Sequence, residues 1–212
     1  MSSLRKGSVE WRTERAVESF GCAASAIGPI ERGMHLFAVT RGQWSMIDAV
    51  LHCLDQVGPS VISLWTWTVA DYEIQCLDRL RLDGRVKSAR LIIDYGARNK
   101  NAGLIRTWQS SFGFESVRFV VNHSKMATIE SEDGRKLLLR GSMNLNFNPR
   151  FEQFDLTEGA DGGFDLVRGL EEELPILPMA CSNAEAVAAS KVSAAFPQET
   201  LDLFTNRRVW AK

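Results

Sequence analysis

Apolar runs of strand length alternate along this chain with longer amphipathic segments, and this alternation restricts the folds that the chain can form. The expected elements are, in chain order, strand 35–40, helix 44–57, strand 61–67, helix 71–82, strand 89–94, helix 104–112 and strand 117–121. A chain with this order forms a mixed or parallel sheet that is covered by helices. The sequence therefore predicts an α/β fold with a mixed β-sheet flanked by helices.

A β-hairpin and two helices are expected in the rest of the chain. The last strand above runs on into residues 122–130, and residues 136–140 return beside it after a Ser-Glu-Asp-Gly turn. Helices are expected over 165–174 and 183–195. A length of 212 residues suits one sizeable core. We expect one domain over 34–177, an N-terminal segment over 1–33, and an Ala-rich helix and tail over 178–212.

Charge and cysteine content exclude several classes of protein. The formal net charge is −1, so any basic surface for nucleic acid must be local. The four cysteines are scattered without a Cys-x-x-Cys pair, which argues against a zinc knuckle or a disulfide framework. The first residues carry charges where a signal peptide needs an apolar core, and no window reaches the length of a membrane span. We expect a cytoplasmic protein without membrane association.

Residues able to handle a phosphate gather around the hairpin. His123 and Lys125 are two residues apart on an extended segment, so both side chains can reach one phosphate. A neutral imidazole can attack phosphorus, while the lysine neutralises the non-bridging oxygens. The Ser142 hydroxyl and the Asn144 amide add neutral donors, and Gly141 permits close backbone approach. This chemistry needs no metal, and we expect no cofactor.

The stretch from His123 to Asn146 resembles the signature of the phospholipase D-like superfamily, which is His-x-Lys, an acidic residue and Gly-Ser-x-Asn. With the preceding strands and helices, the resemblance covers about residues 34–157. It implies a phospholipase D-like fold and a metal-independent phosphodiesterase that forms a phosphohistidine. Compact relatives with a single motif act on nucleic acids, which implies a nuclease with DNA as its expected substrate. The chain also looks similar to phospholipase D-like proteins encoded in phage genomes.

Two carboxylates complete the predicted site. The superfamily usually has aspartate five positions after the lysine, where this chain has Glu130, and the interval from Glu130 to Gly141 is longer than usual. Glu152 stands where members often place another carboxylate, and it would hold the second imidazole nitrogen of His123. Other interpretations stay open: Glu130 suits a solvated loop, and Ser142 and Asn144 suit a turn.

The mechanism needs two imidazoles, because one attacks while the other protonates the leaving oxygen. This chain has one motif only, since neither His35 nor His52 has a lysine two residues later. The simplest solution is a homodimer that brings two copies of His123 together across a two-fold axis. Small single-motif members of the superfamily use this arrangement.

Two alternatives to an active nuclease remain. The glutamate at position 130 is consistent with a catalytically weak or inactive protein that keeps a phosphate pocket and binds nucleic acid. A structural or assembly subunit is the second alternative, with the Ala-rich C-terminal helix making the contacts. Trp65 and Trp67 share one face of their strand, where they stack on bases or fill the core.

Overall fold

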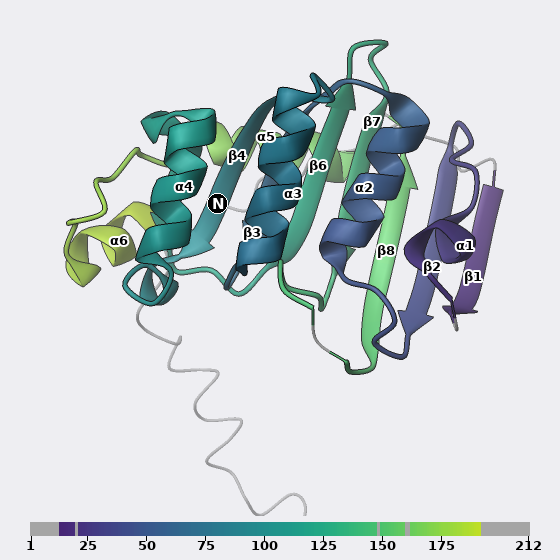
Figure 1. Ribbon diagram of the computed structural model, residues 1–212, viewed down its shortest axis with the longest axis horizontal. Helices are drawn as coiled ribbons and strands as arrows, with labels where there is room; N and C mark the ends of the chain where they lie inside the picture. The colour runs from purple at the N-terminus through teal and green to yellow at the C-terminus, as the bar shows by residue number, and fades with distance from the viewer. Residues whose placement is uncertain (1–12, 20, 148, 160–161, 192–212) are drawn as a thin grey trace, which may run out of the picture.

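The computed structural model describes residues 13–19, 21–147, 149–159 and 162–191. One eight-stranded sheet runs through these residues, with helices against both of its faces (Figure 1). The strands are β1 (Thr13–Ser19), β2 (Met34–Thr40), β3 (Ser60–Thr66), β4 (Val86–Asp94), β5 (Val117–Val120), β6 (Lys125–Ser131), β7 (Lys136–Gly141) and β8 (Glu152–Glu158). The helices are α1 (Ala23–Ile27), α2 (Met46–Val57), α3 (Asp71–Leu82), α4 (Ala102–Phe112), α5 (Gly162–Glu173) and α6 (Asn183–Ser190). The predicted mixed α/β architecture is confirmed.

The sheet combines parallel and antiparallel pairs in the order β1-β2-β8-β7-β6-β3-β4-β5. Parallel pairs form at its two ends, where β1 lies beside β2 and where β3, β4 and β5 follow one another. The pairs between β2 and β3 are antiparallel and run through β8, β7 and β6. The predicted hairpin is the β6–β7 pair, so the motif residues lie at the ends of the two central strands.

The sequence of helix α2 determines where the helix begins, where it ends and which face it buries. The backbone N–H of Ser45 donates to Asp48 Oδ2 at 2.7 Å, which satisfies a donor at the helix start. Gly58 ends the helix with φ of 79°, a conformation that other residues rarely adopt. Between these ends, six apolar side chains are buried against the sheet, namely Met46, Ile47, Ala49, Val50, Cys53 and Leu54. Burial of each large side chain contributes about 1.5–3 kcal/mol.

The two faces of the sheet are packed differently. Helices α1 to α4 cover one face and enclose the main core, whereas α5 lies behind the sheet (Figure 1). Strand β6 alternates accordingly, because Ala127 and Ile129 join the main core while Met126 packs with Phe164 of α5. Residues at alternate positions of a strand therefore place their side chains on opposite faces of the sheet.

Three elements were not predicted. Strands β1 and β8 and the short helix α1 lie in segments to which the sequence analysis assigned no structure. Residues 13–19 pair with β2, so this part of the N-terminal segment belongs to the sheet. The predicted helix over 183–195 is observed as α6, and its last four residues lie outside the described part of the chain. In the described ranges, no helix is long and apolar enough to cross a membrane.

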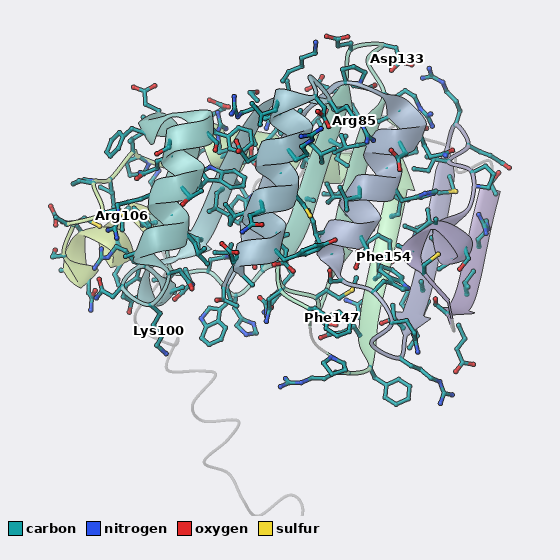
Figure 2. All side chains as sticks on the ribbon, in the orientation of Figure 1. Arg85, Lys100, Arg106, Asp133, Phe147 and Phe154 are labelled. Carbon is teal, nitrogen blue, oxygen red and sulfur yellow. The ribbon has the colours of Figure 1, made fainter. Side chains whose placement is uncertain are left out.

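The ends of five central strands meet along one edge of the sheet, which we call the site edge. Strands β3, β4 and β7 end there, and β6 and β8 begin there, as their registers require. Figure 2 places Phe147 and Lys100 along this edge and Asp133 of the β6–β7 turn at the opposite edge. The site edge therefore collects the loops that carry the sequence motif.

Candidate functional site

His123 and Lys125 are in contact at the site edge. His123 lies in the segment between β5 and β6, and its side chain is exposed. Lys125 is the first residue of β6 and is buried. Its Nζ lies 3.2 Å from His123 Nδ1 and 3.1 Å from Nε2, and it donates to the His123 carbonyl oxygen at 2.7 Å. The predicted pair is thus brought together, with an accessible ring beside a sheltered cation.

The loop that carries His123 is held by a residue that the sequence analysis did not assign to the site. Asn122 is buried, and its Nδ2 donates to the carbonyl oxygens of Thr66 at 2.9 Å and Ser124 at 3.2 Å. Its Oδ1 accepts from the Ser124 N–H at 2.9 Å, and its own N–H donates to Asp94 Oδ2 at 3.0 Å. Four hydrogen bonds to three segments fix the backbone immediately before His123.

Asn144 is held by its amide oxygen. Its Oδ1 accepts from the backbone N–H of Trp67 at 3.2 Å and from Thr66 Oγ1 at 3.4 Å. The following residue is fixed as well, because the Leu145 N–H donates to Thr66 Oγ1 at 3.1 Å. Among the described residues, no hydrogen bond uses the Asn144 Nδ2. The amide therefore keeps two donors for a ligand.

Ser142 and Glu152 bond to each other across the ends of β7 and β8. The Ser142 hydroxyl donates to Glu152 Oε2, and the Gln153 N–H donates to Ser142 Oγ at 3.0 Å. Glu152 was predicted to hold the imidazole of His123. Within the described chain, however, the ring's hydrogen-bond partner is Lys125, and Glu152 bonds to Ser142 instead. This correction makes Glu152 the residue that orients the serine.

Glu152 also acts on Lys125 through its charge. Burial lowers the pKa of Lys125 below its usual range, and the negative charge of Glu152 opposes this shift. A bound phosphate would act in the same direction as Glu152 and stabilise the charged ammonium. The environment of Lys125 therefore favours an anionic ligand.

Gly141 is required by the approach of two strands. A Cβ at this position would lie 2.6 Å from the carbonyl oxygen of Gln153, which is closer than real Cβ contacts. The sequence predicted a close approach of Gly141 to a phosphate, and the structure shows a close approach to the backbone of β8. It brings Ser142 next to β8.

Glu130 is separated from the predicted site. It pairs in register with Lys136 at the far end of β6, close to the β6–β7 turn. Five residues separate it from Lys125, which is about 17 Å along a strand. An odd separation also turns it to the opposite face of the sheet. Glu130 therefore does not act with Lys125 within one subunit, and the prediction for it was wrong in this respect.

The other two histidines bond elsewhere in the subunit. His35 Nε2 lies 3.4 Å from Asp155 Oδ1, and His52 Nε2 lies 2.7 Å from the carbonyl oxygen of Gly28. The chain has three histidines in all. A second imidazole for the site would therefore have to come from another molecule.

Exposed aromatic rings lie on segments at the site edge. Trp67, Phe147 and Phe151 are 46%, 58% and 68% exposed. The guanidinium of Arg41 lies 5.2 Å from the centre of the Phe151 ring. The sequence left Trp67 open between stacking and core, and the structure places it at the surface. Trp65 instead packs beneath α5.

No group of three or more His, Cys, Asp or Glu side chains suited to a metal ion occurs among the described residues.

Comparisons with known proteins find a likeness to solved structures but not to sequences. No family model matches the chain, and no curated protein sequence does. Among solved structures, polyphosphate kinase from Porphyromonas gingivalis aligns with a TM-score of 0.48 and 16% sequence identity. The alignment covers 82% of this chain and 31% of the kinase, so the chain spans about a third of that protein's length.

Proposed function

We propose that this protein is a phospholipase D-like phosphodiesterase that cleaves nucleic acid without a metal ion, at a site shared between two copies of the chain. The observation that carries the proposal is the contact of the Lys125 ammonium with an exposed His123 imidazole, at 3.1 and 3.2 Å. Asn144 and Ser142 lie on neighbouring loops of the same edge. The arrangement provides one nucleophile, one cation and the unused amide hydrogens of Asn144 for a single phosphodiester, while Ser142 donates to Glu152.

The reaction proceeds in two displacements. A neutral nitrogen of His123 attacks phosphorus, and the bond to the leaving oxygen breaks as the phosphohistidine forms. The imidazolium of the second copy protonates that oxygen. It then removes a proton from water, whose oxygen attacks phosphorus and releases His123. Lys125 and the Asn144 amide stabilise the negative charge on the non-bridging oxygens in both steps.

A homodimer supplies the second imidazole in this scheme. His123 is exposed, as a residue shared across a two-fold axis must be before the subunits associate. The remaining histidines are bonded in other parts of the subunit, which supports a second copy as the source.

Nucleic acid is the proposed substrate because the site edge offers rings as well as a cation. Trp67, Phe147 and Phe151 can stack on unpaired bases, and such stacking contributes about 1–3 kcal/mol per base. A single strand fits this surface better than a duplex, since its bases are free to stack, and DNA is the proposed form.

Cleavage of single-stranded DNA, RNA and a bis-aryl phosphodiester in excess EDTA tests the proposal. We expect EDTA-resistant cleavage that falls at least about 100-fold in Lys125→Met, which keeps the aliphatic stem but removes the charge. Lys100→Met is the control, because Lys100 is an exposed cation on the same edge (Figure 2).

Other outcomes would overturn the proposal in distinct ways. Cleavage that stops in EDTA and returns with Mg²⁺ would show a metal-dependent enzyme. Salt-sensitive DNA binding without cleavage would identify the inactive binding protein. Neither binding nor cleavage would leave the structural subunit.

A further inference from the structure

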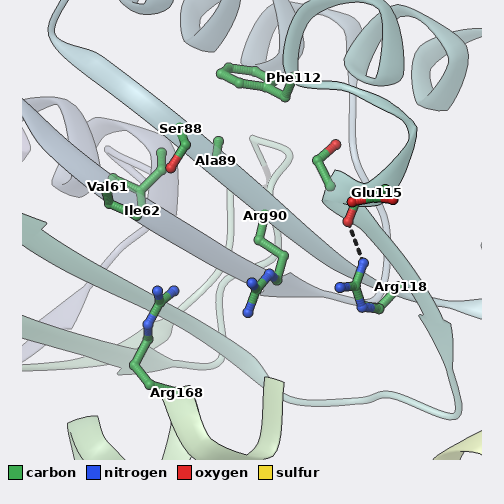
Figure 3. Close-up of a pocket in the computed structure, with 10 residues that line it drawn as sticks. Val61, Ile62, Ser88, Ala89, Arg90, Phe112, Glu115, Arg118 and Arg168 are labelled. Atoms are coloured by element: carbon green, nitrogen blue, oxygen red, sulfur yellow. Dashed lines mark hydrogen bonds between the residues drawn. The ribbon is translucent and has the colours of Figure 1, made fainter. Parts of the chain in front are cut away.

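A polar pocket lies away from the site edge, near the starts of β3, β4 and β5. It has a volume of about 290 Å³ and draws its lining from β3, β4, α4, β5 and α5. Three arginines contribute to it, namely Arg90 of β4, Arg118 of β5 and Arg168 of α5, and we call it the arginine pocket (Figure 3). Figure 3 shows the Arg90 guanidinium between those of the other two. No residue of the proposed reaction lines it.

A buried carboxylate holds two of the arginines in place. Glu171 is fully buried, and its Oε2 accepts from Arg168 Nη1 at 2.9 Å and from Arg90 Nη1 at 3.4 Å. Its Oε1 accepts from the Ser63 hydroxyl and from Trp65 Nε1 at 2.8 Å. Glu171 is therefore saturated by protein donors. It neutralises one of the three cations and orients the other groups.

Arg118 is buried, and no carboxylate of the described residues forms an ion pair with it. Its Nε donates to the Leu174 carbonyl oxygen at 3.0 Å, and its Nη1 donates to the carbonyl oxygens of Glu115 and Val117. Among the described residues, no hydrogen bond uses its Nη2. Burial and the nearby charge of Arg90 both lower its pKa. The charged guanidinium would gain from an anion in the pocket.

The remaining acidic groups are at the surface. Glu172 accepts from Arg90 Nη1 at 2.8 Å, but its side chain is 66% exposed. Glu115 lines the pocket and is also exposed. An incoming anion can displace an exposed carboxylate, whereas it cannot displace Glu171. An extended polyanion, by contrast, must pass these acidic groups at the mouth.

We infer that the arginine pocket binds a small phosphorylated molecule or free phosphate through Arg90, Arg118 and Arg168. Planar guanidinium groups match phosphate oxygens with paired hydrogen bonds. The volume lies at the lower end of the range for ligand pockets, which suits a small anion. Arg90 lies four residues before Asp94 at the site edge, about 13 Å along the strand. The pocket is thus separate from the His123 site.

Phosphate binding measured by calorimetry, with inorganic phosphate and pyrophosphate as probes, tests this inference. All variants carry Lys125→Met, so that binding at the His123 site is suppressed. We expect Arg90→Gln and Arg168→Gln each to weaken phosphate binding at least about tenfold, because each removes a charged hydrogen-bond donor.

Arg81→Gln is the matched control. Arg81 forms an i,i+3 ion pair with Asp78 at 2.9 Å, as Arg168 does with Glu171, but it lies on α3 on the other side of the sheet. We expect its phosphate affinity to stay unchanged. Near-ultraviolet circular dichroism verifies that each variant is folded, and Arg118→Lys replaces any glutamine variant that is not.

Three results would overturn the inference. One is unchanged phosphate affinity in the folded arginine variants. Another is loss of all phosphate binding with Lys125→Met alone, which would assign the phosphate to the His123 site. The third is an arginine-dependent affinity for oligonucleotides but not for phosphate or pyrophosphate. None of these results bears on cleavage in EDTA, so the two proposals fail separately.

Discussion

His123→Ala is expected to reduce kcat/KM for phosphodiester cleavage at least about a thousandfold, the largest effect of any single substitution in this chain. In the proposed reaction, His123 of one subunit is the nucleophile and His123 of the other subunit is the proton donor. Both subunits of the variant carry the substitution, so both groups are lost. Loss of both roles stops the reaction in both halves of a shared site. Rates with a bis-aryl phosphodiester at concentrations well below KM measure the effect.

The substitution should leave folding nearly unchanged. The ring is exposed, and its hydrogen-bond partner among the described residues is Lys125. His52→Gln is the control, since it removes an imidazole that bonds to a carbonyl oxygen elsewhere and keeps a donor. If His123→Ala kept a tenth or more of the activity while His52→Gln lost it, the nucleophile would be misassigned.

Glu171→Ala is expected to lower the free energy of unfolding by about 3–5 kcal/mol, the range for breaking a buried ion pair. The carboxylate is the common acceptor for Ser63, Trp65, Arg90 and Arg168. Its removal leaves the buried donors of Ser63 and Trp65 and the Arg168 guanidinium without this acceptor, whereas Arg90 keeps its ion pair with Glu172. Urea denaturation measures the change.

Glu173→Ala on the same helix is the matched control. Glu173 is 62% exposed and lies 3.7 Å from Lys191, so its loss should change the unfolding free energy by no more than about 0.5 kcal/mol. Equal effects of the two substitutions would show that Glu171 and its partners contribute no more to the unfolding free energy than a surface ion pair does.

Most helices and strands could be predicted from the sequence, because local patterns of apolar residues and turn residues determine them. Strand β3 and helices α2 and α3 have strong apolar periodicity and clear stop signals such as Gly58. Strands β1 and β8 were missed because their sequences, TERAVES and EQFDLTE, alternate with charged residues and resemble exposed loops. The insertion of β8 between β2 and β7 is a long-range pairing that no local pattern encodes.

The candidate site likewise has features that follow from local sequence and features that depend on tertiary packing. A spacing of two residues predicted that His123 and Lys125 reach one phosphate. The structure brings the two side chains into contact, although His123 lies in the loop before β6. Alternation along β6 turns Glu130, five residues after Lys125, to the opposite face of the sheet, and the expectation for Glu130 overlooked this. The partners of Glu152 and Asn122 are set by tertiary packing. Asn122 is recognisable in the sequence only as a turn former.

The arginine pocket had no sequence signal. Arg90, Arg118 and Arg168 come from three elements far apart in the chain and belong to no motif. Only the sheet order, which places β3, β4 and β5 side by side, and the position of α5 bring them together.

A heterodimer with one intact His123 is the most direct test of the shared site. Wild-type and His123→Ala subunits carrying different affinity tags are coexpressed, and the mixed species is isolated on both tags. With one imidazole missing from the single site, we expect its activity to be below about 1% of the wild-type homodimer. Activity near half of wild type, or an active monomer in solution, would show that each chain works alone and would contradict the two-histidine mechanism.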